Sequence, residues 1–377
     1  MSRAFTFYEF FAGGGMARIG LGADWRCLFA NDFDPLKAAT YRANFADAPG
    51  HFHQGDVWAL SPADLPGAPD LAWASSPCQD FSLAGARAGL TGGRSSAFFG
   101  FWRLVEGLDK EGRAPRAIVI ENVTGLLTSH GGRDLEALCD ALAERGYRFG
   151  ALEIDAVGFV PQSRPRLFVV ATRAEPPAGL TGASGYQSRA VREAHARLPA
   201  ALQANWIWWA LPAPPARNTD LAAVLEFDAE VAWHTPAKTA RLLELMAPLH
   251  RARVEAARLQ AGSAVGAVFR RTRRQAGQRV QRAEVRFDGL SGCLRTPRGG
   301  SSRQALLFAG GGEVRSRLLT AREAARLMGL PDNYVLPEGL NAGLHVAGDG
   351  VAVPVVRWLA AHILEPLLRT PSAIAAE

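Results

Sequence analysis

Three short stretches of the chain carry side chains that could do covalent and acid–base chemistry. Cys78 follows a proline in SSPCQDFS, Glu121 closes the apolar run AIVI in ENV, and Arg164 and Arg166 stand two residues apart in QSRPR. A thiolate is a nucleophile, a carboxylate can exchange protons, and guanidinium groups bind anions and carbonyl oxygens. The alternatives are a small buried cysteine, a glutamate that caps a helix, and arginines that anchor a loop through ion pairs.

The cysteines show no pattern typical of a metal site or of disulfides. They are Cys27, Cys78, Cys139 and Cys293, with no C-x-x-C pair. This spacing excludes a disulfide framework and does not fit zinc ligands, so we expect no metal. The stretch MSRAFTFYEF has no signal-peptide pattern, and no apolar run reaches the roughly 18 residues of a membrane helix. We expect a cytoplasmic protein without membrane contact.

A second group of residues suits a cofactor that carries a nucleoside. FAGGGMARIG places the glycines 13–15 after an apolar strand, where the backbone can turn sharply and approach a ligand. Asp32, in NDFD, follows at the spacing of an acid that binds a ribose, and Phe33 beside it could stack on an adenine. Asp56, in HQGDVW, falls where a third strand should end. Each acid alone could be an ordinary loop carboxylate, but their common position at strand ends favours a cofactor.

The elements that must position these residues alternate between strands and helices over the first 172 residues. Such alternation predicts an α/β fold with a mostly parallel sheet, helices on both faces, and ligands at the carboxyl ends of the strands. Just before the last strand, alternation would point Arg164 and Arg166 to the same side. The expected strands are Phe5–Phe11, Cys27–Asn31, Leu71–Ser75, Ala117–Glu121 and Leu167–Ala171, and the expected helices are Asp34–Phe45, Ser95–Leu108 and Arg133–Arg145.

From about residue 174 this pattern gives way to Pro/Gly-rich stretches such as AEPPAGLTGASGYQS. Regular patterning returns after Ser301, with a strand-like ALLFA, a helix in TAREAARLMGL and an apolar helix in AVPVVRWLAAHILEPLL. Thr320 and Glu323 form a capping box at the start of the first of these helices. We therefore expect a first domain part at 1–175, a smaller irregular domain at 176–300, and a return to the first domain at 301–377.

The charge of the chain favours a nucleic-acid partner. The net charge is +6, and the 42 basic residues include only three lysines. Between Arg251 and Arg286 ten arginines face two acids, whereas a solvated helix face would alternate signs. Arginine suits phosphates and guanine edges, although an arginine-rich composition also arises from a GC-rich genome.

Taken in order, FAGGG, NDFD, GD, PCQDFS, ENV and QSRPR resemble the motif series of the cytosine-5 DNA methyltransferases of bacterial type. RLLTAREAARLMGLPDNY and GDGVAVPVV resemble the last two motifs of that family. The resemblance covers the chain except for its middle part, and it implies a class I methyltransferase sheet that resembles the Rossmann fold. The middle part, 176–300, then corresponds to the family's target recognition domain.

The resemblance also implies the chemistry. Cys78 would form a covalent bond to C6 of a flipped-out cytosine, and Glu121 would bind N3 and the exocyclic amine. Arg166 would hold O2, and Arg164 would organise the site. S-adenosylmethionine would be the methyl donor, and its expected binding residues are Phe11, Ala12, Gly13, Gly14, Gly15, Asp32, Phe33, Asp56, Val57, Pro77, Asp349 and Val351.

The partner implied by the resemblance is double-stranded DNA with a specific recognition sequence. Its expected contacts are Gln79, Ser82, Arg270, Arg271, Arg273 and Arg274. We expect a monomer associated with the nucleoid through DNA, and a separately encoded restriction endonuclease is a candidate companion. The alternatives are a methyltransferase that acts on tRNA and a catalytically silent homologue that binds nucleic acid.

One departure from the family pattern concerns Asp349. The family has Gly-Asn-Ser/Ala-Val where this chain has Gly-Asp-Gly-Val, so an acid replaces an amide. Asp349 is either a neutral variant or a residue that tunes cofactor choice or the charge of the site.

Overall fold

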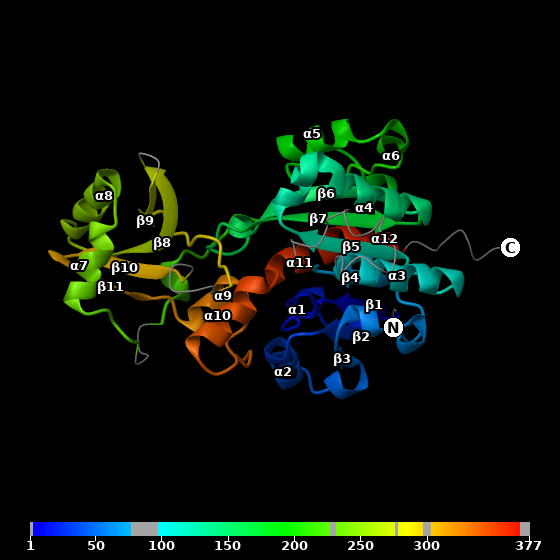
Figure 1. Ribbon diagram of the computed structural model, residues 1–377, viewed down its shortest axis with the longest axis horizontal. Coiled ribbons are helices and arrows are strands. Elements are labelled where there is room, and N and C mark those ends of the chain that lie inside the picture. Colours follow the sequence, from blue (N-terminus) through cyan, green and yellow to red (C-terminus); the bar gives the residue numbers. More distant parts are fainter. Residues whose placement is uncertain (1–2, 77–96, 227–230, 276–277, 297–302, 370–377) are drawn as a thin grey trace. The chain divides into compact units, whose positions relative to one another are not determined.

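The computed structural model describes residues 3–76, 97–226, 231–275, 278–296 and 303–369 (Figure 1). The chain forms two compact units. The first unit comprises Met1–Asp155, Pro165–Pro214 and Val351–Glu377, and the second comprises Ala156–Arg164 and Pro215–Gly350.

The first unit is built on a seven-stranded sheet in the order β3-β2-β1-β4-β5-β7-β6. Strands β1 to β5 are parallel, whereas β7 runs antiparallel to both β5 and β6. Every residue of β4 and β5 is buried, as expected for parallel strands covered on both faces. The strands are β1 Phe5–Phe10, β2 Trp25–Asp32, β3 Phe52–Gln54, β4 Leu71–Ala74, β5 Ala117–Asn122, β6 Arg148–Asp155 and β7 Pro165–Thr172.

Helices cover both faces of this sheet (Figure 1). Apolar side chains of α3 and α4, among them Phe101 and Leu138, pack on one face of β1, β4 and β5. Helix α1 packs against α11 with Gly20 and Val356 in close approach, and the Trp25 indole donates to Glu365 of α12 over 3.1 Å. The helices are α1 Met16–Leu21, α2 Pro35–Asn44, α3 Ala97–Lys110, α4 Arg133–Glu144, α5 Arg189–Arg197, α6 Ala200–Ala204, α11 Val353–Leu359 and α12 Glu365–Arg369.

The second unit contains a four-stranded antiparallel sheet in the order β11-β10-β8-β9. Helices α7 and α8 pack on one face of it, where Leu242, Met246 and Val254 meet Val268 and Leu307 in a separate core. The strands are β8 Ala264–Gln275, β9 Gln278–Arg286, β10 Ala305–Gly310 and β11 Glu313–Leu318, and the helices are α7 Pro236–Glu244, α8 Pro248–Arg258, α9 Ala321–Leu327 and α10 Leu340–Asp349.

The α/β class and five of the expected strands are confirmed, as is the capping box of Thr320 and Glu323. The expectation that residues 176–300 are irregular is wrong, because this range contains the long hairpin of β8 and β9 as well as α5 to α8. The arginine-rich sequence of the hairpin lacks the apolar alternation that marks a strand, and the pairing of β8 and β9 supplies the order instead.

The compact units also have other boundaries than the expected domain parts. Residues 176–214 lie in the first unit, where the backbones of Trp206 and Phe149 pair and the Trp209 indole donates to Val170. Residues 301–350 lie in the second unit, because β10 pairs with β8. The division into catalytic and target-recognition parts remains a prediction about function.

One segment of the described chain, Leu340–Arg369, is long and apolar enough to cross a membrane by length and composition. This observation differs from the expectation of no such run. A buried share of 61% fits a core helix of a globular protein equally well, so the segment is weak evidence for a membrane.

Candidate active site and cofactor-binding site

The glycine-rich turn after β1 has an unusual backbone. Phe11 has φ +57° and Gly13 has φ +57°, both in the left-handed region. The amide of Ala12 donates to the carbonyl of Asn31 over 2.9 Å, and the amide of Gly13 donates to Oδ2 of Asp32 over 2.8 Å. The two expected cofactor motifs, FAGGG and NDFD, are therefore joined at the carboxyl ends of β1 and β2.

Gly13 and Gly15 serve different purposes in this turn. A Cβ atom on Gly15 would lie 2.3 Å from the ring of Phe45, so Gly15 is required by packing. A Cβ atom on Gly13 would meet nothing within 4 Å. Gly13 therefore faces open space, as a residue must if a ligand is to approach its backbone. Gly14 is buried between them.

Asp32 and Phe33 lie at the end of β2 with opposite exposure. Asp32 is 5% exposed, and its Oδ1 accepts from the amide of Asp34 over 2.9 Å. Burial raises the pKa of this carboxyl. Phe33 is 67% exposed, a high value for a phenylalanine. An acid fixed by two backbone amides beside an exposed ring fits the ribose and the adenine of a nucleoside.

Asp56 lies in the turn after β3. It caps the 3-10 turn Val57–Ala59, accepting from the amide of Trp58 over 3.0 Å, and Val57 is buried. Asn31 fixes this turn next to β2, because its side-chain amide donates to the carbonyls of His53 and Gly55. Asn31 was not among the expected site residues, although its position before Asp32 in NDFD was a usable signal.

Glu121 and Arg166 form an ion pair, with 3.3 Å between Oε1 and Nε. Glu121 is the last residue but one of β5 and is 7% exposed. Arg166 is the second residue of β7 and also donates to the carbonyl of Pro165. A largely buried carboxylate held by a guanidinium can bind the polar edge of a flat heterocycle.

Asn122, which follows Glu121 and ends β5, is bonded to the residues just after β4. Its side-chain amide donates to the carbonyl of Ser76 over 3.1 Å, and its Oδ1 accepts from the amide of Val123. Sequence reasoning singled out the first residue of ENV and missed this second one. Pro77, Cys78, Gln79 and Ser82, which follow Ser76, lie outside the described residues.

Two of the other cysteines are poor nucleophiles. Cys27 and Cys139 are buried, and burial raises the pKa of both thiols, that of Cys27 to about 12. The thiolate is the reactive form of cysteine, so these side chains act as small apolar groups. Cys293 is half-buried, and its sulfur lies 3.4 Å from Nη1 of Arg164.

Arg164 is 2% exposed and binds three backbone carbonyls. Its guanidinium donates to the carbonyls of Leu294, Gly348 and Gly350 over 3.0, 2.9 and 2.6 Å. Sequence alternation predicted that Arg164 and Arg166 point to the same side. Arg164 lies before the first residue of β7, so strand alternation does not extend to it.

Asp349 ends α10 and is bound by two side chains of the second unit. One oxygen accepts from Oγ1 of Thr296, and the other lies 3.2 Å from Nε2 of His345 one turn earlier. Val351, the first residue after the second unit, is buried.

The four arginines expected to contact DNA lie on β8, where alternation divides them between two faces. Arg271 and Arg273 share Glu284 on one face, at 3.4 and 2.5 Å. Arg270 and Arg274 lie on the other face, and burial together with Arg303 lowers the pKa of Arg270. The described residues contain no group of three or more His, Cys, Asp and Glu side chains that could hold a metal.

Comparison with solved structures identifies the fold. The Entamoeba histolytica methyltransferase EhMeth matches with a TM-score of 0.60 and 12% identity over 97% of this chain and 99% of its own. A crystal structure of a Spodoptera frugiperda DNMT2 mutant matches with a TM-score of 0.59 and 17% identity over 95% and 99%. At these identities the likeness concerns the fold alone.

Sequence comparison identifies relatives. The chain is 28% identical to the type II methyltransferase M.HpaII of Haemophilus parainfluenzae, over 96% of this chain and 90% of the relative. It is 26% identical to M1.ScrFI of Lactococcus lactis subsp. cremoris, over 95% and 78%. The family C-5 cytosine-specific DNA methylase matches residues 5–365. This chain therefore belongs to the C-5 cytosine-specific DNA methylase family.

Proposed function

We propose that the protein transfers a methyl group from S-adenosylmethionine to C5 of a cytosine in a specific sequence of double-stranded DNA. The chain belongs to the C-5 cytosine-specific DNA methylase family, and its relatives include type II methyltransferases. The observation that carries the proposal is the ion pair of Glu121 and Arg166, since it presents a carboxylate and a guanidinium together at the carboxyl end of the sheet.

Glu121 and Arg166 have the chemistry to bind the polar edge of cytosine. The Glu121 carboxyl would hold N3 and the exocyclic amine, and the Arg166 guanidinium would hold O2. Negative charge builds on the ring when a thiolate adds to C6, and hydrogen bonds at N3 and O2 stabilise it. The cytosine must leave the duplex to reach these groups, at a cost of about a few kcal/mol.

Cys78 is the proposed nucleophile. Its thiolate adds to C6 and makes C5 electron-rich, which splits one difficult substitution into easier steps. C5 would then bond to the methyl group and displace S-adenosylhomocysteine, and removal of the proton from C5 would let the thiolate leave C6. Asn122 supports this role, because it binds the Ser76 carbonyl two residues before Cys78 and so fastens the start of the loop to β5.

The residues at the ends of β1, β2 and β3 fit the cofactor. Gly13 faces open space, Asp32 is oriented by backbone amides, and Phe33 offers an exposed ring. Asp32 would bind the ribose, Phe33 would stack on the adenine, and Asp56 would bind the adenine amine. S-adenosylmethionine, when bound, supplies an electrophilic methyl group. We propose a structural role for Arg164, which fixes the backbone at Gly348 and Gly350.

The protein would act as a cytoplasmic monomer on duplex DNA, with a restriction endonuclease as a candidate companion. The test is whole-genome bisulfite sequencing of a methylation-free bacterial host that expresses the wild type, Cys78→Ser or Cys293→Ser. We expect modified cytosines in one short sequence context with the wild type and with Cys293→Ser, and none with Cys78→Ser. Folded wild-type protein that leaves the genome unmodified would refute the proposal, and methylation of tRNA in the same host would redirect it to RNA.

A further inference from the structure

One face of the β8–β11 sheet is not covered by α7 and α8. Val268, Ala283 and Leu307 point into the core beneath α7 and α8. Side chains alternate along a strand, so the residues next to each of them in its strand point to the opposite face. We call this opposite face the arginine face. The strand residues described on it include Arg271, Arg273, Arg282, Arg286, Arg315, Arg317, Glu284 and Glu313.

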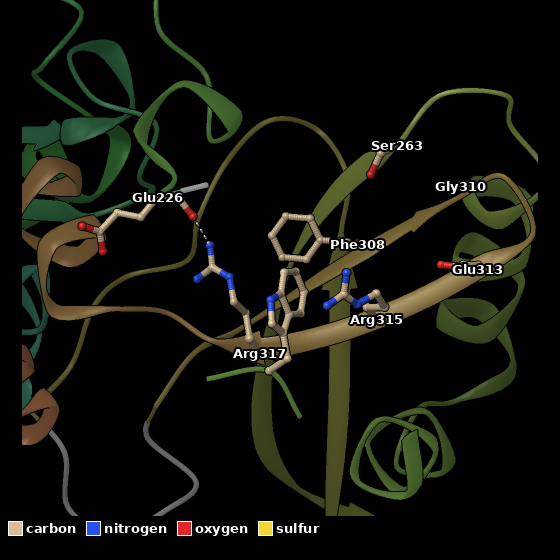
Figure 2. A pocket seen from close by; sticks show the side chains of 8 residues that line it. Glu226, Ser263, Phe308, Gly310, Glu313, Arg315 and Arg317 are labelled. Carbon is tan, nitrogen blue, oxygen red and sulfur yellow. Dashed lines mark hydrogen bonds between the residues drawn. The ribbon is translucent and has the colours of Figure 1, made fainter. Parts of the chain in front are cut away.

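Two aromatic rings stand at the β10–β11 edge of the arginine face. Trp233 pairs with Arg317 through a backbone bridge, and its ring meets Phe308 edge to face at 5.0 Å between centroids. The guanidinium of Arg315 lies 3.9 Å from the centre of the Trp233 ring. Figure 2 shows Phe308 with Arg317 on one side and Arg315 on the other. These residues line a cavity of about 360 Å³.

Arg315 and Arg317 differ in what they can still bind. Arg317 is 1% exposed and is neutralised by Glu323, with 2.8 Å between Nη1 and Oε2. Arg315 is exposed, and in the described part of the chain its guanidinium makes no hydrogen bond or ion pair. Glu226 is no partner for it, because its carboxylate accepts from Thr320 and points away from Phe308 and Arg315 (Figure 2).

An arginine that stacks on an aromatic ring keeps its N–H groups available for hydrogen bonds. A guanidinium on an aromatic ring uses its flat face, while its N–H groups lie in the plane and can bind an anion in forked geometry. The ring also restricts the side chain before binding, so less rotamer freedom is lost when a phosphate is bound. Arg271 repeats the arrangement on the same face, 4.8 Å above the ring of Phe269.

We propose that Arg315, held on Trp233, binds a phosphate of the DNA backbone. The inference rests on the proposed function and adds to it a contact beyond the arginine-rich hairpin. Through the pairing of β11, β10 and β8, Arg315 lies level with Val265 of β8. Arg271 is six residues farther along β8 and two strands away, so the two arginines are about 20 Å apart. Phosphates that far apart lie within about six base pairs along a duplex, so one duplex can reach both arginines.

The test is the salt dependence of duplex binding, because each lost phosphate contact lowers the slope of log K against log salt by about 0.9. Fluorescence anisotropy with a labelled 25-base-pair duplex measures the affinity of the wild type and of Arg315→Gln. The measurement is repeated over a KCl range of about 50–200 mM. We expect Arg315→Gln to weaken binding about three- to tenfold and to reduce the slope by about 0.9. An unchanged affinity and slope would overturn the inference.

Further variants separate a phosphate contact from a merely structural role. Arg315→Lys keeps the charge and should keep the slope, while Trp233→Leu should weaken binding without changing the slope. Glu313→Gln removes a negative charge two residues from Arg315 and should strengthen binding. The matched control is Arg258→Gln, since Arg258 lies on α8 and is neutralised by Glu255 at 2.6 Å. Thermal melts verify that each variant is folded. Arg315→Gln should disturb the fold least, because the side chain of Arg315 is exposed.

The binding assay contains no cofactor, so it is independent of methyl transfer. A wild type that methylates DNA while Arg315→Gln binds normally would refute this inference alone. A wild type that binds DNA through Arg315 but transfers no methyl group would refute the proposed reaction alone. Tighter binding of tRNA than of the duplex, or no binding of the duplex by the wild type, would overturn the contact proposed here.

Discussion

Glu121 and Arg166 are diagonal neighbours on two antiparallel strands. Glu121 pairs with Phe168 across β5 and β7, and Arg166 lies two residues from Phe168, so the two charged side chains share a face of the sheet. Their facing atoms are 3.3 Å apart. A shift of one residue in this register would send the two groups to opposite faces, so the register itself defines the candidate site.

Replacement of Glu121 tests its proposed contact with the base. Glu121→Gln keeps the size of the side chain but removes its charge and one acceptor. We expect kcat to fall about 100- to 1,000-fold, because charge that develops on the ring loses its stabilisation. Single-turnover transfer of a labelled methyl group to DNA would measure this. DNA affinity should change less than about threefold, and the exposed Glu144→Gln should behave as wild type. A kcat within a few fold of the wild type would contradict the assignment.

Phe33 offers a test of cofactor binding without loss of stability. Phe33 is 67% exposed, so Phe33→Ala should change the free energy of unfolding by less than about 0.5 kcal/mol. Loss of stacking on adenine should raise the Kd for S-adenosylmethionine about tenfold in isothermal titration calorimetry. Leu259→Ala is the matched control, because Leu259 is 70% exposed and lies in the second unit. Equal Kd values for both variants would exclude Phe33 from the cofactor site.

Glu9, on β1, should make stability depend on pH. Burial raises the pKa of Glu9 to about 8, from an ordinary value near 4.5. Between these values the folded state holds a proton that the unfolded state has released, so stability falls as pH rises from about 4.5 to about 8. Glu9→Gln mimics the protonated form and removes this loss. We therefore expect the variant to gain Tm over the wild type at pH 8.5, by an amount that vanishes near pH 4.5.

The control for this prediction is Glu144→Gln, which removes an exposed carboxylate from α4. Its Tm should follow that of the wild type throughout the pH range. A Tm of Glu9→Gln at or below that of the wild type at pH 8.5 would contradict a raised pKa of Glu9.

Asp349 connects the end of α10 to Thr296, which gives a physical reason for an acid at this position. A carboxylate accepts from Thr296 on one oxygen and from His345 on the other, whereas an asparagine has a single acceptor oxygen. Asp349→Asn should lower the free energy of unfolding by about 1 kcal/mol in urea titrations. The Kd for S-adenosylmethionine should not change, and a large change would instead support a role of Asp349 in cofactor choice.

Much of the first unit could be predicted from the sequence. Strands such as Ala117–Asn122 are apolar runs that end in polar residues, and local signals mark helix ends, as when Asp34 caps α2 by accepting from Leu36 and Lys37. Strand β6 was missed because RFGALEID mixes charged and apolar residues without a clear period. The β8–β9 hairpin was missed for the same reason, since its order comes from pairing.

The sequence by itself determined the α/β class, the family and the residue types of the candidate site, because these depend on motifs and on local periodicity. Only the tertiary structure decided which of these residues meet. Arg164 and Arg166 are two residues apart, yet one binds the carbonyls of Gly348 and Gly350 and the other pairs with Glu121. Arg315 carries no motif, and its place on Trp233 follows from β-strand pairing. Contacts between residues distant in sequence depend on register and on the packing of both partners, and neither is encoded in a local window.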